Sequence, residues 1–190
     1  MLVEEYVKSF EVKDGIFYHL SVKADHAKDF ASFEMGGTYL IGSRDSPIGR
    51  RWRNSSVRTY DAKIMKYSYQ VMLREAVFES MRLKNFPSLP SRYSCLFLSD
   101  TLEGAHKWAA RIPQEGERQI LKLQLLDGQL HRTNESHLPI EHLNIAELEL
   151  WAGKYWNGLA GNRLTELLFC GHLTVKEIIS MPPRVSSVGK

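Results

Sequence analysis

The stretch Glu166-Leu-Leu-Phe-Cys-Gly-His-Leu-Thr-Val-Lys-Glu-Ile-Ile179 does most to decide the fold. It holds two apolar runs of strand-like composition, 167–169 and 173–179, and Gly171 lies between them as a point where the chain can bend. Glu166 is a lone carboxylate at the mouth of the first run. Burying an unpaired carboxylate is costly, because the charged form loses its hydration. This acid therefore lies either just outside the sheet or is held there for chemistry.

Helical periodicity and start and stop signals predict two helices and a strand upstream. Apolar residues at helical spacing predict a helix from Asp61, which can cap it, to Lys84. The segment 93–99 predicts a buried strand, and a short helix should run from about Thr101 to Arg111, where Ile112-Pro113 ends it.

Alternating residues and turn signals predict the rest. The alternation in 119–126, followed by Asp127-Gly128, predicts a hairpin that returns through 129–132. The segment 146–155 is a short helix or an aromatic loop, and the strand opened by Glu166 follows. Strands and helices do not alternate regularly, so we expect an α+β fold with a mostly antiparallel or split sheet and inserted helices.

Length and composition indicate one soluble domain. The 190 residues are 43% hydrophobic and 25% charged, so we expect a single domain over 1–181 and a disordered tail over 182–190. No apolar run is long enough for a membrane span, and the start Met-Leu-Val-Glu-Glu lacks the basic residues of a signal peptide. We therefore expect a cytoplasmic protein. Cys95 and Cys170 are expected to be buried thiols, and no Cys/His spacing predicts a metal site.

The net charge of +3 is modest, but basic residues gather between positions 44 and 66. They are Arg44, Arg50, Arg51, Arg53, Arg58, Lys63 and Lys66, against two acids. The segment is either a solvated loop or a surface that faces phosphate, for which arginine forks are well shaped.

Three short motifs carry candidate catalytic or binding residues. The first is 17–21, Phe-Tyr-His-Leu-Ser, on a predicted strand with His19. The second is 96–108, Leu-Phe-Leu-Ser-Asp-Thr-Leu-Glu-Gly-Ala-His-Lys-Trp, a strand that leads into a helix. The third is the strand opened by Glu166.

In their order and spacing, these motifs resemble the ADP-ribosyltransferase superfamily, in the diphtheria-toxin and poly-ADP-ribose-polymerase branch with its His-Tyr-Glu triad. The resemblance implies that family's split sheet, NAD as co-substrate and no metal. It implies that Glu166 is the catalytic group, because a carboxylate stabilises the positive charge that develops on ribose as nicotinamide leaves.

The resemblance also implies roles for the residues that line the NAD site. His19 and Ser21 would hydrogen-bond ribose hydroxyls, while Phe97 and Trp108 would stack on nicotinamide. Arg92 would pair with NAD phosphates, although a surface ion pair is an equal alternative. We expect His19, Trp108 and Glu166 to line one cleft.

The sequence departs from the family pattern at three positions. Leu20 replaces a glycine beside the cofactor, and Trp108 replaces a tyrosine. The arginine-modifying enzymes carry a glutamate two positions before the catalytic one, where this chain has Leu164, so arginine is a less favoured target.

The segment before Glu166 is the place where related enzymes choose the acceptor. Trp151, Tyr155 and Trp156 would form a stacking platform there, or a packed helix, and Glu149 would act as a general base. Together with Arg50, Arg51 and Arg53 as phosphate contacts, these residues favour nucleic acid, RNA or DNA, over protein as the acceptor.

The leading hypothesis is a compact ADP-ribosyltransferase of toxin or anti-phage type, for which an antitoxin or inhibitor partner is left open. An NAD glycohydrolase and a relative of the RNA 2′-phosphotransferases are the enzymatic alternatives. A non-catalytic module that binds RNA or a protein partner is the third interpretation; it predicts salt-dependent binding without NAD consumption.

Overall fold

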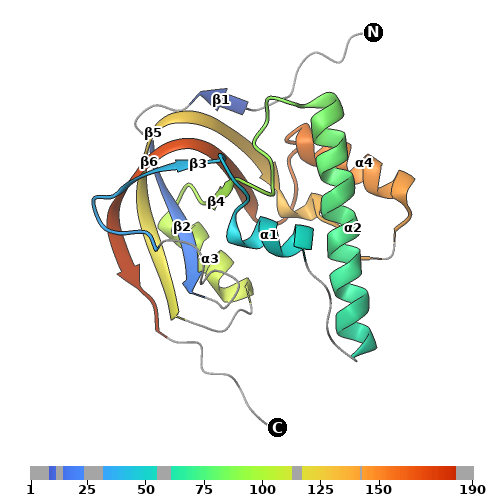
Figure 1. Ribbon diagram of the computed structural model, residues 1–190, viewed down its shortest axis with the longest axis horizontal. Helices are drawn as coiled ribbons and strands as arrows, with labels where there is room; N and C mark the ends of the chain where they lie inside the picture. Colours follow the sequence, from blue (N-terminus) through green and yellow to red (C-terminus); the bar gives the residue numbers. More distant parts are fainter. Residues whose placement is uncertain are drawn as a thin grey trace.

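The described part of the chain forms one curved, mostly antiparallel sheet with helices beside it (Figure 1). The structure is a computed structural model that describes residues 9–11, 15–23, 32–54, 61–112, 117–141 and 143–182. The prediction of an α+β fold with a mostly antiparallel sheet is confirmed. Among the described residues, no helix combines the length and the apolar composition that a membrane span requires.

Two long strands, β5 (Glu117–Asn134) and β6 (Thr165–Ser180), form the centre of the sheet and arch across Figure 1. Gly128 pairs with Gly171, and their φ angles are 141° and 143°. A Cβ on either residue would lie 2.2 Å from a backbone oxygen of the opposite strand. Glycine therefore lets both strands bend at this point while they remain paired.

Four short strands are added along this central pair. Strands β1 (Ser9–Glu11) and β2 (Gly15–Lys23) pair with β5, whereas β3 (Thr38–Ile41) and β4 (Leu96–Leu98) pair with β6. One isolated bridge, Tyr18 to Ser99, joins β2 to β4. The motif strand with His19 is thereby brought beside the second motif.

Two hydrophobic cores lie on the two faces of the strands. The alternation in β6 sends Leu167 and Phe169 into the first core, with Leu121, Leu123 and Leu125 of β5. Leu168 points the other way, into a second core that it shares with residues of the helices. The period of two along a strand thus sorts neighbouring residues between the cores.

Helices lie beside the sheet (Figure 1), and two of them contribute buried residues to the second core. They are α1 (Pro47–Asn54), α2 (Ala62–Asn85), α3 (Leu102–Arg111) and α4 (Ile145–Trp156), with a 3₁₀ turn at Glu135–His137. The predicted first helix and its Asp61 cap are confirmed, since Asp61 accepts from the amides of Lys63 and Ile64. The predicted helix that ends at Arg111 is also confirmed, with Thr101 as its cap.

Three sequence predictions need correction. The hairpin at Asp127-Gly128 is wrong, because β5 runs through both residues and pairs with β6 instead. The two strands expected around Gly171 are one bent strand, β6. The strand expected over 93–99 is limited to Leu96–Leu98. The predicted disordered tail lies outside the described residues from position 183 onward.

The two cysteines lie next to β4 and in β6 as free thiols. Cys95 is buried, as expected, whereas Cys170 is only half-buried. Burial raises the pKa of the Cys95 thiol well above its usual value and that of Cys170 to about 11, so both are neutral at pH 7.

Candidate functional site

Glu166 is the second residue of β6, and its side chain is buried on the face of the strand that borders the second core. Its side chain must point away from the first core, because the next residue, Leu167, points into it. Only 7% of Glu166 is exposed. The first of the two sequence alternatives, an acid outside the sheet, is therefore wrong, and the structure must compensate a buried carboxylate.

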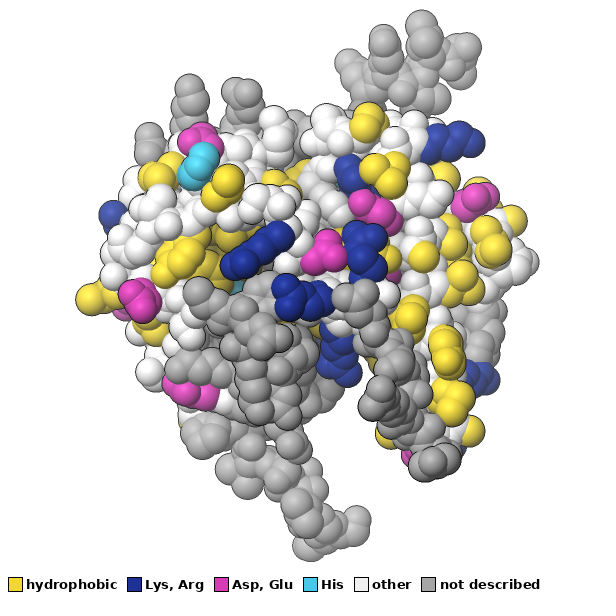
Figure 2. Space-filling view, viewed as in Figure 1, with side chains coloured by type: hydrophobic (Ala, Val, Ile, Leu, Met, Phe, Trp, Pro, Cys, Tyr) yellow, Lys and Arg dark blue, Asp and Glu magenta, His cyan; other side chains and the backbone are white. Residues whose placement is uncertain are grey.

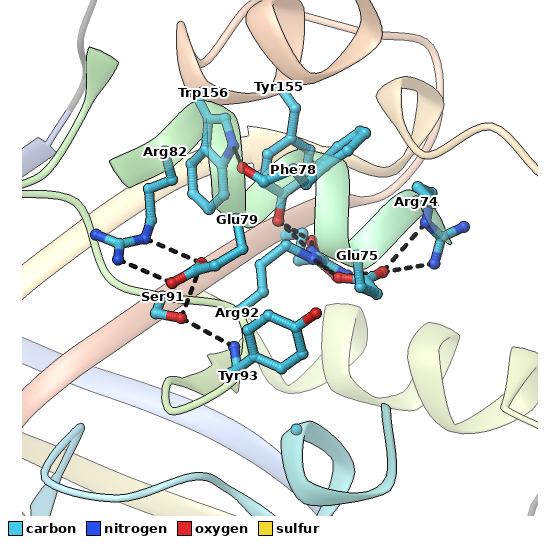
Figure 3. A network of polar contacts seen from close by, with 12 residues as sticks. Arg74, Glu75, Phe78, Glu79, Arg82, Ser91, Arg92, Tyr93, Tyr155 and Trp156 are labelled. Carbon is cyan, nitrogen blue, oxygen red and sulfur yellow. Dashed lines mark hydrogen bonds and ion pairs between the residues drawn. The ribbon is translucent and has the colours of Figure 1, made fainter. Parts of the chain in front are cut away.

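Arg92 and Tyr155 supply that compensation (Figure 3). The Nη1 atom of Arg92 lies 2.5 Å from Glu166 Oε2, and the Tyr155 hydroxyl donates to the same oxygen. Arg92 Nη1 also donates to the Tyr155 oxygen, so the three groups form a closed triangle. Both bonds to the carboxylate end on Oε2, and no described residue donates to Oε1.

A second buried acid, Glu75 of α2, shares Arg92. The Arg92 Nε atom lies 2.7 Å from Glu75 Oε2, and Arg74 Nη2 lies 2.7 Å from Glu75 Oε1. Burial alone would raise the pKa of Glu75, but the charges of Arg92 and Arg74 and their hydrogen bonds lower it. The pKa of Arg92 is well above its ordinary value: burial alone would lower it, but the carboxylates of Glu166 and Glu75 more than offset this. Arginine and carboxylate thus keep each other charged in the interior.

An adjacent ion pair fixes the loop that delivers Arg92 (Figure 3). Arg82 pairs with Glu79 at 2.9 Å and donates to the carbonyl oxygens of Pro87 and Leu89. The Ser91 hydroxyl donates to Glu79 at 3.0 Å. The chain just before Arg92 is therefore anchored to the last turns of α2.

Aromatic rings surround the Arg92 guanidinium. Its central carbon lies 5.4 Å from the ring centre of Trp52, 5.1 Å from Phe97 and 5.0 Å from Tyr155. Such contacts favour a cation that is removed from water. Arg92 is thus fully engaged by protein groups, and the expectations of a phosphate contact or a surface ion pair both need correction.

His19 occupies the junction where β2 meets β4. Tyr18 and Ser99 exchange two backbone hydrogen bonds there, and next to them His19 Nδ1 lies 2.8 Å from the Phe97 carbonyl oxygen. A carbonyl oxygen only accepts, so Nδ1 carries the hydrogen and Nε2 is an acceptor. Burial lowers the pKa of His19 to about 4, more than the bond to Phe97 raises it, so the ring is neutral at pH 7.

The three predicted motifs meet around β4, but His19 and Glu166 do not touch. Strand β4 lies between β2 and β6, and Phe97 links the two sides. The Phe97 carbonyl oxygen accepts a hydrogen bond from the His19 imidazole, and the Phe97 ring packs against Arg92, the partner of Glu166. His19 pairs with Leu121 of β5, which lies in the first core, whereas Glu166 faces the second core. The two side chains therefore lie on opposite faces of the strands, and the expectation that they line one cleft needs correction.

The other residues expected to line the NAD site lie on α3, β2 and β4. The Trp108 indole nitrogen of α3 donates to the Thr165 carbonyl oxygen at 3.2 Å, which places this half-buried ring beside the residue that precedes Glu166. Ser21 is half-buried on β2, two residues beyond His19. Phe97 is half-buried, and its ring centre lies 6.3 Å from that of Trp52.

The expected aromatic platform on α4 needs correction. Tyr155 and Trp156 are fully buried, and the Trp156 indole donates to the Phe78 carbonyl oxygen at 2.8 Å. Neither ring has an exposed face on which a base can stack. Trp151 is half-buried under the Lys154 ammonium, which lies 4.2 Å from its ring centre, and Glu149 is exposed on the same helix.

The expected basic contacts lie on and beside α1. Arg50, Arg51 and Arg53 are exposed, and Arg53 pairs with Asp45 at 2.9 Å. Figure 2 shows Lys and Arg side chains gathered near the middle of the face of the molecule that it draws. Arg58, the further member of the basic segment, lies outside the described residues.

Sequence reasoning missed Arg74 and Glu75. Both lie on α2 at positions that helical spacing assigns to the buried face, between Val71 and Phe78. Two adjacent charges within an apolar face were the available signal, because buried charges need partners.

A family model described as "Protein of unknown function (DUF2441)" matches residues 26–181. This is most of the chain, and the protein belongs to this family. No curated protein sequence matches it.

Proposed function

For this member of the DUF2441 family, we propose NAD-dependent transfer of ADP-ribose to a macromolecular acceptor, with Glu166 as the catalytic carboxylate. The observation that carries the proposal is the asymmetric setting of that carboxylate. Arg92 and Tyr155 hold Oε2, while Oε1 receives no hydrogen bond from a described residue. A fixed orientation suits a carboxylate that stabilises charge on ribose, and its second oxygen would then bind a ribose hydroxyl.

The proposed reaction exchanges one bond at the ribose C1 atom. The bond to the nicotinamide nitrogen breaks, and its electron pair leaves with the neutral ring. A lone pair of the acceptor forms the new bond to C1, and the acceptor loses a proton. Positive charge develops on the ribose between the two events, and the Glu166 carboxylate would stabilise it and hold a ribose hydroxyl through Oε1.

One neighbouring side chain suits the base. His19 faces the first core, on the opposite face of the strands from Glu166, so no contact with the ribose is proposed for it. The Trp108 ring, fixed beside Thr165, would stack on nicotinamide. Arg92 would act on Glu166 rather than on the NAD phosphates, because Glu75, Glu166 and Tyr155 engage its nitrogens.

The test is transfer of label from NAD. The protein is incubated with NAD labelled in the adenylate part and with RNA, DNA or cell protein, and both nicotinamide release and labelled acceptor are measured. We expect release and labelling together, and a loss of about 100-fold or more in the Glu166→Gln variant. Glu177→Gln, an exposed acid on the same strand, is the matched control and should match the wild type.

The outcomes separate the alternatives. Nicotinamide release without a labelled macromolecule would indicate an NAD glycohydrolase. No release, together with an unchanged melting temperature in millimolar NAD, would contradict the proposal and favour a non-catalytic binding module, because a ligand that binds only the folded state stabilises it. Glu166→Gln can also weaken the fold, so its melting temperature and its stabilisation by NAD are measured alongside.

A further inference from the structure

The first half of α2 presents an exposed surface that the reaction at Glu166 does not use. From Ala62 to Leu73, no residue of this helix is buried, and the first buried residue is Arg74. Tyr67 is 56% exposed and Tyr69 is 55% exposed. These rings stand in solvent on a helix whose second half is packed against the body of the protein.

Lysines accompany the two tyrosines at helical spacing. Lys63 precedes Tyr67 by four residues, and Lys66 precedes Tyr69 by three, so each ring has an ammonium group on the adjacent turn. Lys63 and Lys66 are themselves three residues apart and both are exposed. The tyrosines thus flank a pair of lysines along one stripe of the helix, which we term the Tyr-Lys surface (Lys63, Lys66, Tyr67 and Tyr69).

Basic side chains outnumber acidic ones in this region. Between the cap Asp61 and the buried Glu75, the helix carries no acidic residue. Helix α1 lies beside it, with the exposed arginines 50, 51 and 53 (Figures 1 and 2). A row of cations with interleaved aromatic rings is complementary to a strand of phosphates with unstacked bases.

We propose that the Tyr-Lys surface binds single-stranded nucleic acid, with the lysines on phosphates and the tyrosine rings against bases. The bound nucleic acid would be the acceptor of the proposed ADP-ribosyl transfer, so the biological role of this surface rests on that proposed function. The binding itself requires no NAD. Tyrosine rings can stack on unpaired bases, whereas the bases of a duplex are already stacked on one another, so single strands are preferred over duplex.

The test is fluorescence anisotropy with a labelled single-stranded RNA of about 12 nucleotides, measured without NAD over a range of salt concentrations. We expect binding that weakens as salt rises. Lys63→Gln/Lys66→Gln should lower the slope of log K against log salt by about 1.4, at about 0.7 for each phosphate contact. Tyr67→Ala/Tyr69→Ala should weaken binding by about 30-fold or more, as expected for the loss of two stacked bases.

Two controls separate this surface from general attraction to a polyanion. Tyr67→Phe/Tyr69→Phe retains both rings and should bind within about twofold of the wild type, since stacking needs the ring and not the hydroxyl. Lys84→Gln, at the other end of α2, should leave binding unchanged. All these side chains are exposed, so none of the substitutions should alter folding.

The inference is overturned if the RNA does not bind at 50 mM salt, if the alanine variant binds like the wild type, or if a duplex binds as tightly as the single strand. It fails separately from the proposed function. Nicotinamide release and protein labelling without RNA binding would contradict only the nucleic-acid surface, whereas RNA binding without NAD turnover would contradict only the proposed chemistry.

Discussion

Replacement of Arg92 by methionine should destabilise the protein strongly at neutral pH. Arg92 is 4% exposed and pairs with both Glu75 and Glu166 at 2.7 and 2.5 Å. Methionine fills a similar volume but leaves two buried carboxylates with less compensation. Removal of one partner from a buried ion pair costs about 3–5 kcal/mol, and we expect a loss in this range.

The loss should shrink in acid. In the wild type, Arg92 and Arg74 lower the pKa of Glu75 against the effect of burial. A lowered folded-state pKa contributes stability above the unfolded pKa of about 4.3, and this contribution disappears as pH falls through the folded value. Without Arg92, the effect of burial on Glu75 is less compensated and its pKa rises, so the variant recovers stability as Glu75 becomes protonated. The difference from the wild type is therefore greatest near pH 8 and smallest near pH 4.

Urea denaturation of both proteins at pH 8 and pH 5 measures this difference. Arg132→Met is the matched control, because it breaks an ion pair with Asp100 at 3.1 Å whose side chains are 37% and 44% exposed. Exposed pairs contribute about 0–1 kcal/mol. The reasoning is refuted if the Arg92 variant loses no more free energy of unfolding than the control, or if its loss grows as pH falls.

Three further predictions test the fold and the site. Trp156→Phe should cost about 2–3 kcal/mol in urea denaturation, because it opens space in the second core and removes the bond to Phe78, whereas Trp151→Phe should cost less than about 1 kcal/mol. Gly171→Ala should cost at least about 1–3 kcal/mol in the same assay, since its φ is 143° and its Cβ would meet the opposite strand. His19→Gln should flatten the fall in stability between pH 6.5 and 4. Burial lowers the pKa of wild-type His19 to about 4, so between pH 6.5 and 4 this residue binds a proton in the unfolded state but not in the folded state. A steeper fall in the stability of the variant would contradict this.

The helices of this protein are readable from its sequence because their signals are local. Asp61 and Thr101 precede apolar periodicity and cap α2 and α3 as expected. The turn at Asp127-Gly128 was misread, because the same dipeptide suits a tight turn and a close crossing of paired strands. Only the opposing glycine, 43 positions further along at Gly171, decides between the two, and that pairing is a property of the sheet.

The candidate site is predictable only in part, for a related reason. The sequence marks Glu166 as an unusual acid, but its partners come from the loop before β4 and from α4, and Arg92 has its second acidic partner on α2. Tyr155 and Trp156 are neighbours in an aromatic segment that suggests a surface, yet one orients the acid and the other fills the core. Composition alone does not separate an exposed aromatic residue from a buried one.

Helix α2 connects the two proposals physically. Tyr67 lies on its free first half, and Glu75 lies about two turns later in the buried cluster that holds Arg92. A helix is stiff over this length, so a nucleic acid bound at the Tyr-Lys surface would be held in a fixed position relative to Glu75. Because Arg92 joins Glu75 to Glu166, the helix for which we propose nucleic-acid binding also belongs to the cluster that orients the carboxylate of Glu166.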